Sequence, residues 1–428
     1  MNDLSPYGDN PFINALGPIR DRREMSRALL QTPARPPDIA NLSYAVRLHW
    51  LMQLREMHLP RIEELRLAES LDLATRHSYA QRTPHSPEVW SALMQEPVFQ
   101  PALNMPAGVV SLVGHSGTGK TEAVTRILKR YPQIIAHDRL PNLAGKHLQV
   151  AWVSVCVPPS GRTVDLAEVL MKAWDRATLP FLKGEPRFAH TLAQQRRYGP
   201  RMLEEWRQVA SSHFLGLLHL DEIQNLFKLA TLSQRKSRTN GKKGAGHHVD
   251  DYWAGLPIVE DHMLKWILSI ANEWGMALCI SGTPDGLNAL RSRFSVSQRI
   301  SSLGHHRFQP FQADDAEFVG VFLQALLRHQ YVSTPLQMSD ELAHLLIELT
   351  AGIPRLLVGL WIAAHRIAFE RNEDRLRLED LIAGAKTTLA PVMPAVQALN
   401  SGNPQLMERF EDLMPDDFDL WEALGHPL

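Results

Sequence analysis

The sequence predicts an α/β fold, in which a parallel sheet is covered by helices on both faces and followed by a small all-helical region. Between residues 102 and 313, β-branched apolar runs suited to buried strands alternate with stretches of helical periodicity. The first of these runs leads into a glycine-rich turn and then into a helical pattern. From residue 314 to about 389 the pattern is helical throughout. This order predicts an α/β core followed by a helical lid.

Composition limits the class of protein. The chain has 428 residues, enough to bury a large core, and Lys+Arg 45 balance Asp+Glu 46. Any affinity for nucleic acid must therefore come from local patches. Cys156 and Cys279 both lie in apolar strand-like runs, which predicts two inert core thiols and excludes a disulfide framework. No apolar run approaches the ~18 residues of a membrane span, and the N-terminus lacks a signal-peptide pattern, so we expect a soluble cytosolic protein without a membrane partner.

The segments before and after the core differ from it in composition. Residues 1 to about 40 are rich in proline and predict an extended arm, and Ser43–Ala80 reads as helical with a break at Pro60. Inside the core, His147–Val157 predicts one long buried strand. The predicted domains are an arm with an N-terminal helical segment (1–101), an α/β core with a basic insertion at 228–249 (102–313), a helical lid (314–389) and an acidic tail (390–428).

The glycine-rich turn has the spacing G-x-x-x-x-G-K-T of a P-loop, between a strand and a helix. Its glycines would let backbone N–H groups converge on a phosphate chain, and the helix N-terminus would face the same phosphates. Lys120 would reach the β- and γ-phosphates of ATP, and the Thr121 hydroxyl would bind Mg²⁺. The residues predicted to bind the nucleotide here are Gly114, His115, Ser116, Gly117, Thr118, Gly119, Lys120, Thr121 and Glu122.

A second strand, in "LLHLDEIQNL", ends in two acids, the arrangement of a Walker B motif. Asp221 would hold Mg²⁺, directly or through a water, and Glu222 would orient and polarise the attacking water. A P-loop kinase can also end a strand in acids, but the adjacent glutamate favours ATP hydrolysis over transfer to a second substrate. The sequence therefore predicts an Mg²⁺-dependent ATPase.

Two further motifs offer groups to the phosphates. The next strand ends in "CISGTP", where Ser281 or Thr283 would contact the γ-phosphate or the water; a helix-capping turn is an equally good interpretation. Arg355 stands in the first turn of a lid helix, where a cation opposes the helix dipole. That position favours an anionic partner such as the bound phosphates, with a salt bridge as the alternative.

Three arginines follow the "CISGTP" strand: Arg291, Arg293 and Arg299. One of them would project into a neighbouring subunit and stabilise charge in the transition state, as an arginine finger does. The sequence does not distinguish Arg293 from Arg299 in this role. Any one of them alone is more often a surface arginine.

Two stretches predict partners. Residues 228–249 carry basic side chains and no acid, so they would neutralise DNA phosphates; a solvated insertion is the alternative. The candidates are Lys228, Arg235, Lys236, Arg238, Lys242 and Lys243. Asn403–Leu428 has seven acids against one arginine, interleaved with large apolar side chains such as Trp421. Such a tail predicts a peptide that folds onto a basic, grooved partner, with a merely solubilising end as the alternative.

In this order, the P-loop, "LDEIQNL", "SGTPDGL" and "GIPRLLVGLWIAA" resemble AAA+ ATPases and, among them, the TnsC/TniB family, the ATP-dependent regulators of heteromeric-transposase transposons and functional cousins of MuB. The resemblance covers Ala102–Leu389, and the arginine region matches less well. It implies a bacterial cytoplasmic homo-oligomer, a ring or a filament, on double-stranded DNA of any sequence. It also implies ATP and Mg²⁺ as cofactors, and a role in linking a target-selection protein of the TniQ/TnsD type to the transposase.

Other classes share parts of this pattern. An origin-recognition or helicase-loading AAA+ factor would be expected to carry a winged-helix domain after the lid. A signalling NTPase that binds proteins and no DNA would be expected to carry long repeat or effector domains. A metabolic P-loop kinase is least favoured, because the helical lid and the arginine cluster would have no role in it.

Overall fold

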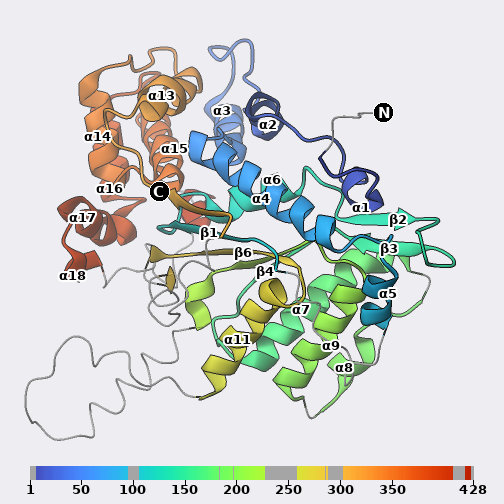
Figure 1. Ribbon diagram of the computed structural model, residues 1–428. Coiled ribbons are helices and arrows are strands. Elements are labelled where there is room, and N and C mark those ends of the chain that lie inside the picture. Colours follow the sequence, from blue (N-terminus) through green and yellow to red (C-terminus); the bar gives the residue numbers. More distant parts are fainter. Residues whose placement is uncertain are drawn as a thin grey trace, which may run out of the picture. The chain divides into compact units, whose positions relative to one another are not determined.

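The computed structural model describes residues 6–94, 106–182, 184–195, 197–226, 258–284, 286–287, 302–407 and 420–425. It divides into two compact units, a sheet unit and a lid unit (Figure 1). The sheet unit comprises Met1–Arg22, Arg66–Val113 and Val124–His306, and the lid unit comprises Arg23–Leu65, Gly114–Ala123 and Arg307–Leu428. These boundaries differ from the predicted domains, because the P-loop and part of the N-terminal region group with the lid.

The strands and helices that lie mainly in the sheet unit alternate along the chain. The strands are β1 (Val109–Gly114), β2 (Ile134–His137), β3 (His147–Val150), β4 (Trp152–Cys156), β5 (Leu217–Asp221), β6 (Ala277–Gly282) and β7 (Gly304–Phe308). The helices are α1 (Pro11–Asn14), α4 (Ile62–Gln81), α5 (Pro87–Met94), α6 (Lys120–Leu128), α7 (Thr163–Thr178), η2 (Leu179–Phe181), α8 (Ala189–Ala193), α9 (Gly199–Ser212), η3 (Ile223–Leu226) and α11 (Ile258–Asn272).

Five strands form one sheet in the order β4-β5-β6-β1-β7. The pairs β4–β5, β5–β6 and β6–β1 are parallel, with Leu218 opposite Leu278 and Val110 opposite Cys279. The carboxyl ends of these parallel strands therefore meet at one edge of the sheet, where open α/β sheets bind their ligands. The predicted fold class, a parallel sheet with helices followed by a helical region, is confirmed.

The predicted single strand His147–Val157 is wrong, because the structure splits it in two. β3 pairs antiparallel with β2, with Gln149 opposite Ile135, whereas β4 joins the five-stranded sheet. At the break, the buried Ala151 donates its N–H to the Gln133 carbonyl at 2.8 Å. Apolar and β-branched residues continue across this junction, so periodicity alone does not show where one strand ends.

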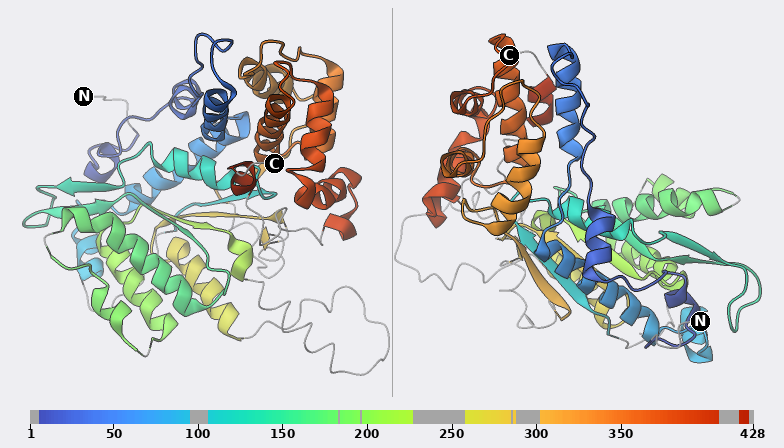
Figure 2. Two further views of the ribbon diagram at one scale, coloured as in Figure 1. Left: turned by 180° about the vertical axis from the view of Figure 1, so that it is seen from behind. Right: turned by 90° about the horizontal axis from the view of Figure 1, so that it is seen from above.

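Helices α7, α9 and α11 pack with the sheet in one apolar core (Figures 1 and 2). Leu166, Leu170 and Trp174 recur at helical spacing along α7 and are all buried. The Trp174 ring meets Trp206 of α9 edge-on, with centroids 6.2 Å apart. Burial of each such side chain stabilises the unit by roughly 1.5–3 kcal/mol, so this core holds the strands that carry the site.

The lid unit is helical. Its elements are α2 (Arg22–Leu29), α3 (Tyr44–Met52), η1 (Gln53–Glu56), the π-helix η5 (Phe318–Phe322), α13 (Leu323–Arg328), α14 (Asp340–Thr350), α15 (Pro354–Glu370), α16 (Leu378–Lys386), η6 (Ala390–Val392), α17 (Met393–Ser401), α18 (Pro404–Met407) and α19 (Leu420–Gly425). Helical structure thus continues past residue 390, where the acidic tail was predicted to begin, and Val392 and Val396 are buried in the lid core.

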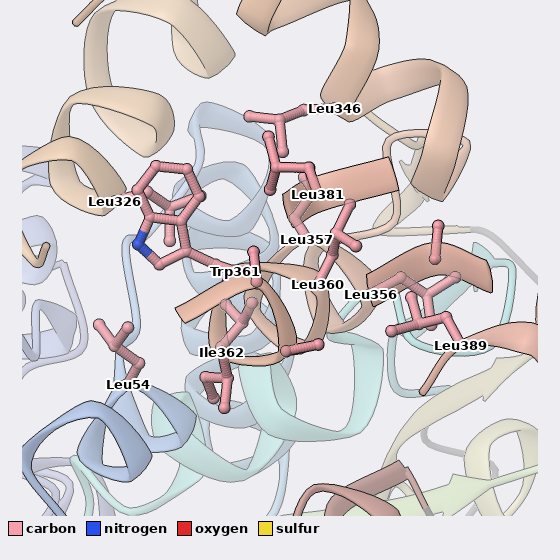
Figure 3. Packing of buried hydrophobic residues seen from close by; sticks show 14 of the residues in the cluster. Leu54, Leu326, Leu346, Leu356, Leu357, Leu360, Trp361, Ile362, Leu381 and Leu389 are labelled. Atoms are coloured by element: carbon pink, nitrogen blue, oxygen red, sulfur yellow. The ribbon is translucent and has the colours of Figure 1, made fainter. Parts of the chain in front are cut away.

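Helix α15 forms the centre of this lid core (Figure 3). Leu357, Leu360 and Trp361 are fully buried, and the Trp361 indole N–H donates to the His329 carbonyl at 3.2 Å. The turn before α15 needs Gly352, which has φ +67° and where a Cβ would collide with the Phe311 backbone. This turn sets the angle at which α15 begins.

The segment with α3 and η1 packs into the same core through Leu51 and Leu54. Arg47 of α3 is 3% exposed, and its guanidinium bonds to Asp374 at 2.6 Å and to the Tyr331 carbonyl at 3.2 Å. An N-terminal segment is thereby fixed to residues 284 and 327 positions later in the chain. Among the described residues, no single helix is long and apolar enough to cross a membrane, and α14 with α15 reaches that mark only across a bend of 111°.

The fully buried His365 makes the stability of the lid depend on pH. Its Nδ1–H donates to the Trp361 carbonyl at 2.7 Å, and its Nε2 accepts the Tyr331 N–H at 3.3 Å, so the ring is neutral. Burial lowers its pKa to about 4, below the value of ~6.5 in an unfolded chain. Between these values the unfolded state binds more protons, so stability falls as the pH falls.

From His365 alone we expect the free energy of unfolding to drop by about 1 kcal/mol between pH 7.5 and pH 5.5. Urea denaturation at both pH values measures this. His365→Gln should flatten the pH dependence by that amount, whereas the control His344→Gln, at an exposed histidine of α14, should not. An equal pH dependence in both variants would contradict the assignment.

Candidate nucleotide-binding site

The P-loop follows β1 directly and leads into α6. Gly117 and Gly119 have φ +77° and +92°, a backbone region that other residues rarely adopt. A Cβ on Gly114 would lie 2.7 Å from the Phe308 carbonyl oxygen and 2.7 Å from Thr118 Oγ1. Each glycine of the motif is therefore required by the local geometry.

Polar side chains tie this loop to the start of α6. The Thr118 hydroxyl donates to the His115 carbonyl at 2.8 Å, and Lys120 Nζ donates to the same oxygen at 3.0 Å. Lys120 is only 5% exposed, whereas Thr121 and Glu122 are exposed in the first turn of α6. A nearly buried ammonium beside a helix N-terminus suits an anion such as a phosphate.

The lid helix α15 contacts the P-loop within the same unit. The Arg355 N–H donates to the Gly117 carbonyl at 3.4 Å. A Cβ on Gly117 would lie 2.9 Å from Ile353 Cγ2 and 3.4 Å from Arg355 Cβ, so the loop is closely packed against the start of α15. The predicted phosphate-facing Arg355 thus stands next to the loop that was predicted to hold the phosphates.

Helix α19 from the predicted tail packs on α15. Leu420 is fully buried, and a Cβ on Gly359 would lie 2.9 Å from it; Arg366 also donates to the Leu424 carbonyl. The Trp421 ring lies 5.8 Å from the Arg355 guanidinium and 4.8 Å from that of Arg55. Trp421, predicted to anchor a partner, here lies partly buried against the lid.

An open pocket of about 480 Å³ adjoins this ring. Trp421 forms one wall, and α3 with η1 supplies the others through Met52, Arg55 and Glu56. The C-terminal helix therefore meets both the N-terminal segment of the lid unit and the arginine beside the P-loop.

The acidic motif lies at the end of β5, in the sheet unit. Asp221 is the last strand residue and is 4% exposed, and its Oδ1 accepts the Glu222 N–H at 3.0 Å. Glu222 has φ +55°, a left-handed conformation that is uncommon outside glycine. Such backbone strain is characteristic of functional positions and turns the chain sharply after the strand.

Gln224 holds Glu222 in place, a role that the sequence did not predict. Its Nε2 donates to Glu222 Oε2, and its Oε1 accepts the Thr283 N–H at 3.2 Å. A Cβ on Gly282 or Gly286 would come within 2.7 or 2.5 Å of Gln224, so both glycines make room for it. The predicted Thr283 thus takes part through its backbone N–H, by fixing the amide that fixes Glu222.

Asp221 is held from inside the sheet. The Ser281 hydroxyl of β6 donates to Asp221 Oδ1, and His219 Nε2 lies 2.8 Å from Ser281 Oγ. On the other side, His219 Nδ1 lies 2.8 Å from Ser154 Oγ of β4. Burial lowers the pKa of His219, and the neighbouring Asp221 partly opposes this shift. The sequence signal was one polar residue within the apolar run "LLHL".

The prediction that both cysteines are core thiols is half wrong. Cys279 is buried, but Cys156 is exposed at the end of β4, where it stands opposite Asp221 in the strand register. Side chains alternate between the two faces of a strand, so a residue within an apolar run can still point away from the core, as Cys156 does.

Several predicted residues lie outside the described residues. These are the arginine-finger candidates Arg291, Arg293 and Arg299 and the basic side chains Lys228, Arg235, Lys236, Arg238, Lys242 and Lys243. Where the structure is described, no group of three or more metal-ligating side chains occurs. The Thr121 hydroxyl in the lid unit and the Asp221 carboxylate in the sheet unit are each, by their chemistry, a type of oxygen ligand that Mg²⁺ accepts alongside phosphate and water.

Residues 103–290 match the family model described as "AAA domain". Together with the parallel five-stranded sheet and the P-loop, this match defines the class of protein: the chain contains an AAA domain with the AAA+ P-loop NTPase fold.

Among the solved structures to which the chain is similar is the Aeropyrum pernix ORC1 protein in complex with DNA, at 16% identity, 86% coverage of this chain, 82% of that chain and a TM-score of 0.41. The chain is also similar to the Walker-type ATPase of Pyrococcus abyssi, at 13% identity, with 79% of this chain and 87% of that chain covered and a TM-score of 0.40. A third similar structure is the Drosophila ORC bound to DNA, at 13% identity, with 97% of this chain and 90% of that chain covered and a TM-score of 0.40. No curated protein matches the sequence.

Replacing Gln224 should slow hydrolysis without affecting ATP binding, because its amide contacts Glu222 and Thr283. For Gln224→Leu we expect turnover to fall on the order of ten- to a hundredfold, since Glu222 loses its orientation. The control Gln133→Leu removes an amide that bonds to the Trp152 carbonyl elsewhere in the sheet unit, and it should retain turnover. Steady-state phosphate release measures turnover, and nucleotide titration measures ATP binding. Equal turnover in Gln224→Leu and Gln133→Leu would refute the role of Gln224 in positioning Glu222.

Proposed function

We propose that the protein is an ATP-dependent AAA+ regulator of DNA transposition that assembles as a homo-oligomer on double-stranded DNA. It would link a target-selection protein of the TniQ/TnsD type to the transposase. The observation that carries the ATPase part is the P-loop, whose glycine geometry and nearly buried Lys120 suit a phosphate chain, with Arg355 packed against it. The resemblance of the motifs to the TnsC/TniB family supports the transposition part.

In this proposal the P-loop N–H groups and Lys120 hold the phosphates of ATP, and Thr121 with Asp221 holds Mg²⁺. When bound, Mg²⁺ neutralises charge on the phosphate oxygens. Glu222 orients the attacking water and accepts its proton, and Gln224 keeps the Glu222 carboxylate in position. Arg355 faces the phosphates from the lid, and Arg293 or Arg299 of a neighbouring subunit completes the site.

The DNA part of the proposal rests on residues 228–249, which carry basic side chains and no acid. Such a segment binds the phosphate backbone of any sequence and gains free energy from counterion release. Because it comes soon after β5, Glu222 and the short helix η3 along the chain, the nucleotide state would set its position.

We expect duplex binding that requires ATP, ignores sequence and weakens steeply with salt. Lys242→Ala/Lys243→Ala should reduce the slope of log K against log salt by about two and leave ATP binding unchanged. The control Lys146→Ala/Lys172→Ala removes the same charge from exposed lysines of the sheet unit and should keep the slope. Fluorescence anisotropy of a labelled duplex at several salt concentrations measures this slope. An unchanged slope in Lys242→Ala/Lys243→Ala would place the DNA contact elsewhere.

The transposition role is tested by strand transfer. Purified protein with ATP should stimulate insertion by its cognate transposase into target DNA, and Lys120→Ala protein should not. ATP-dependent duplex binding without any stimulation would favour another AAA+ DNA factor, of the origin-recognition or helicase-loading type.

A further inference from the structure

A histidine stands in the middle of β5, a strand of the sheet unit whose five residues are all buried. His219 is 1% exposed, and its neighbours Leu218 and Leu220 are fully buried. Burying a polar side chain costs free energy unless its donors and acceptors are satisfied. Here both ring nitrogens meet hydroxyl groups, one on each neighbouring strand: Ser154 on β4 and Ser281 on β6.

Ser154, His219, Ser281 and Asp221 form a series of hydrogen bonds, and the direction of each bond follows from the last member, Asp221. The carboxylate of Asp221 can only accept, so the Ser281 hydroxyl donates to Oδ1. The proton of Ser281 is then committed, and Ser281 Oγ must accept from His219 Nε2–H. In a neutral ring Nδ1 is then an acceptor, and it takes the hydroxyl proton of Ser154. Ser154 thus favours the tautomer in which Ser281 points its proton at Asp221.

This series fixes the orientation of one carboxylate. Asp221 Oδ1 accepts from the Ser281 hydroxyl and from the Glu222 N–H at 3.0 Å, so two donors from different elements converge on one oxygen. His219, Ser281 and Asp221 are all less than 5% exposed. The carboxylate is therefore set by groups within the sheet as well as by the turn that follows it.

We propose that His219 is a positioning residue, and that the Ser154–His219–Ser281 series orients Asp221 for its Mg²⁺ ion. Outer groups of this kind, which hold a metal ligand through hydrogen bonds, typically change metal affinity 10- to 100-fold when they are lost. The proposal rests on the proposed function, because it assigns Asp221 to the Mg²⁺ of bound ATP. A purely structural histidine would affect folding and leave the metal dependence unchanged.

The test compares His219→Leu, which removes both ring nitrogens, with His219→Gln, whose side-chain amide can place an N–H near the position of Nε2. ATP affinity in EDTA should be the same in both variants and in the wild-type protein, since the series does not involve the P-loop. Mn²⁺ affinity of the ATP-bound protein, measured by electron paramagnetic resonance, should fall at least tenfold in His219→Leu. In His219→Gln it should stay within about threefold of the wild type.

The Mg²⁺ concentration for half-maximal turnover should rise in parallel with the loss of Mn²⁺ affinity. Wild-type Mn²⁺ affinity in His219→Leu, or an equal loss in the leucine and glutamine variants, would overturn the proposal. If His219→Leu does not fold, Ser154→Ala takes its place, with Ser154→Thr as its hydroxyl-retaining control, and the same comparison decides. Failure of the wild-type protein to bind Mg²⁺ with ATP would instead reject the proposed function.

Discussion

Lys120→Ala is expected to abolish ATP binding and, with it, assembly on DNA. Lys120 Nζ donates to the His115 carbonyl at 3.0 Å, so its charge is held at the glycine loop. Hydrogen bonds that involve an ionised group contribute about 1.5–3 kcal/mol each, and an ammonium that bonds to two phosphates makes at least two of them. We therefore expect ATP affinity to fall by at least a hundredfold.

Calorimetric titration with ATP measures this loss. Lys129→Ala removes the same charge just beyond the end of α6, at an exposed position, and should bind ATP as the wild type does. Matching affinities for the two variants would mean that the nucleotide is held elsewhere.

Glu222→Gln is expected to bind ATP normally while hydrolysis falls by two to four orders of magnitude. The amide keeps the shape of the side chain but cannot accept a proton from the attacking water, and general-base catalysis contributes 10²–10⁴-fold. The left-handed backbone at Glu222 and the bond from Gln224 do not depend on this charge, so the local fold should persist.

Single-turnover hydrolysis, together with binding of a non-hydrolysable analogue, separates the two effects of Glu222→Gln. Glu273→Gln, an exposed carboxylate that follows α11, is the control and should hydrolyse at the wild-type rate. If turnover in Glu222→Gln matches this control, Glu222 does not orient the water.

The parts of the site that the sequence predicts are those held within one short stretch of chain. Residues 114–122 form a loop and helix start because their glycines, lysine and threonine stand at fixed spacing. Asp221 is the last residue of its strand, and Glu222 follows it directly. The motif "GIPR" predicts Arg355 in the first turn of a helix, and α15 does begin at Pro354. Such local relations need no knowledge of strand order.

The parts that the sequence did not predict join residues about 60 positions apart. His219 meets Ser281 only because β5 pairs with β6 in a particular register, and a one-residue shift would turn one of these side chains to the other face. Gln224 meets the Thr283 N–H just beyond the ends of the same two strands. The docking of α19 was missed for a related reason. It depends on the space that Gly359 leaves on α15, and nothing in the tail sequence records that space.

The contact of Trp421 with Arg355 and Arg55 makes the C-terminal helix thermodynamically linked to the surroundings of the P-loop. A molecule that pulls Trp421 away must first break two cation–π contacts, each about 0.5–1 kcal/mol at exposed sites. Conversely, an anion that draws Arg355 off the ring removes one of these two contacts and weakens the hold on the helix by the free energy of that contact, because coupling between two binding events is reciprocal. Through the Trp421 side chain, release of the C-terminal helix and binding of an anion at Arg355 would each favour the other.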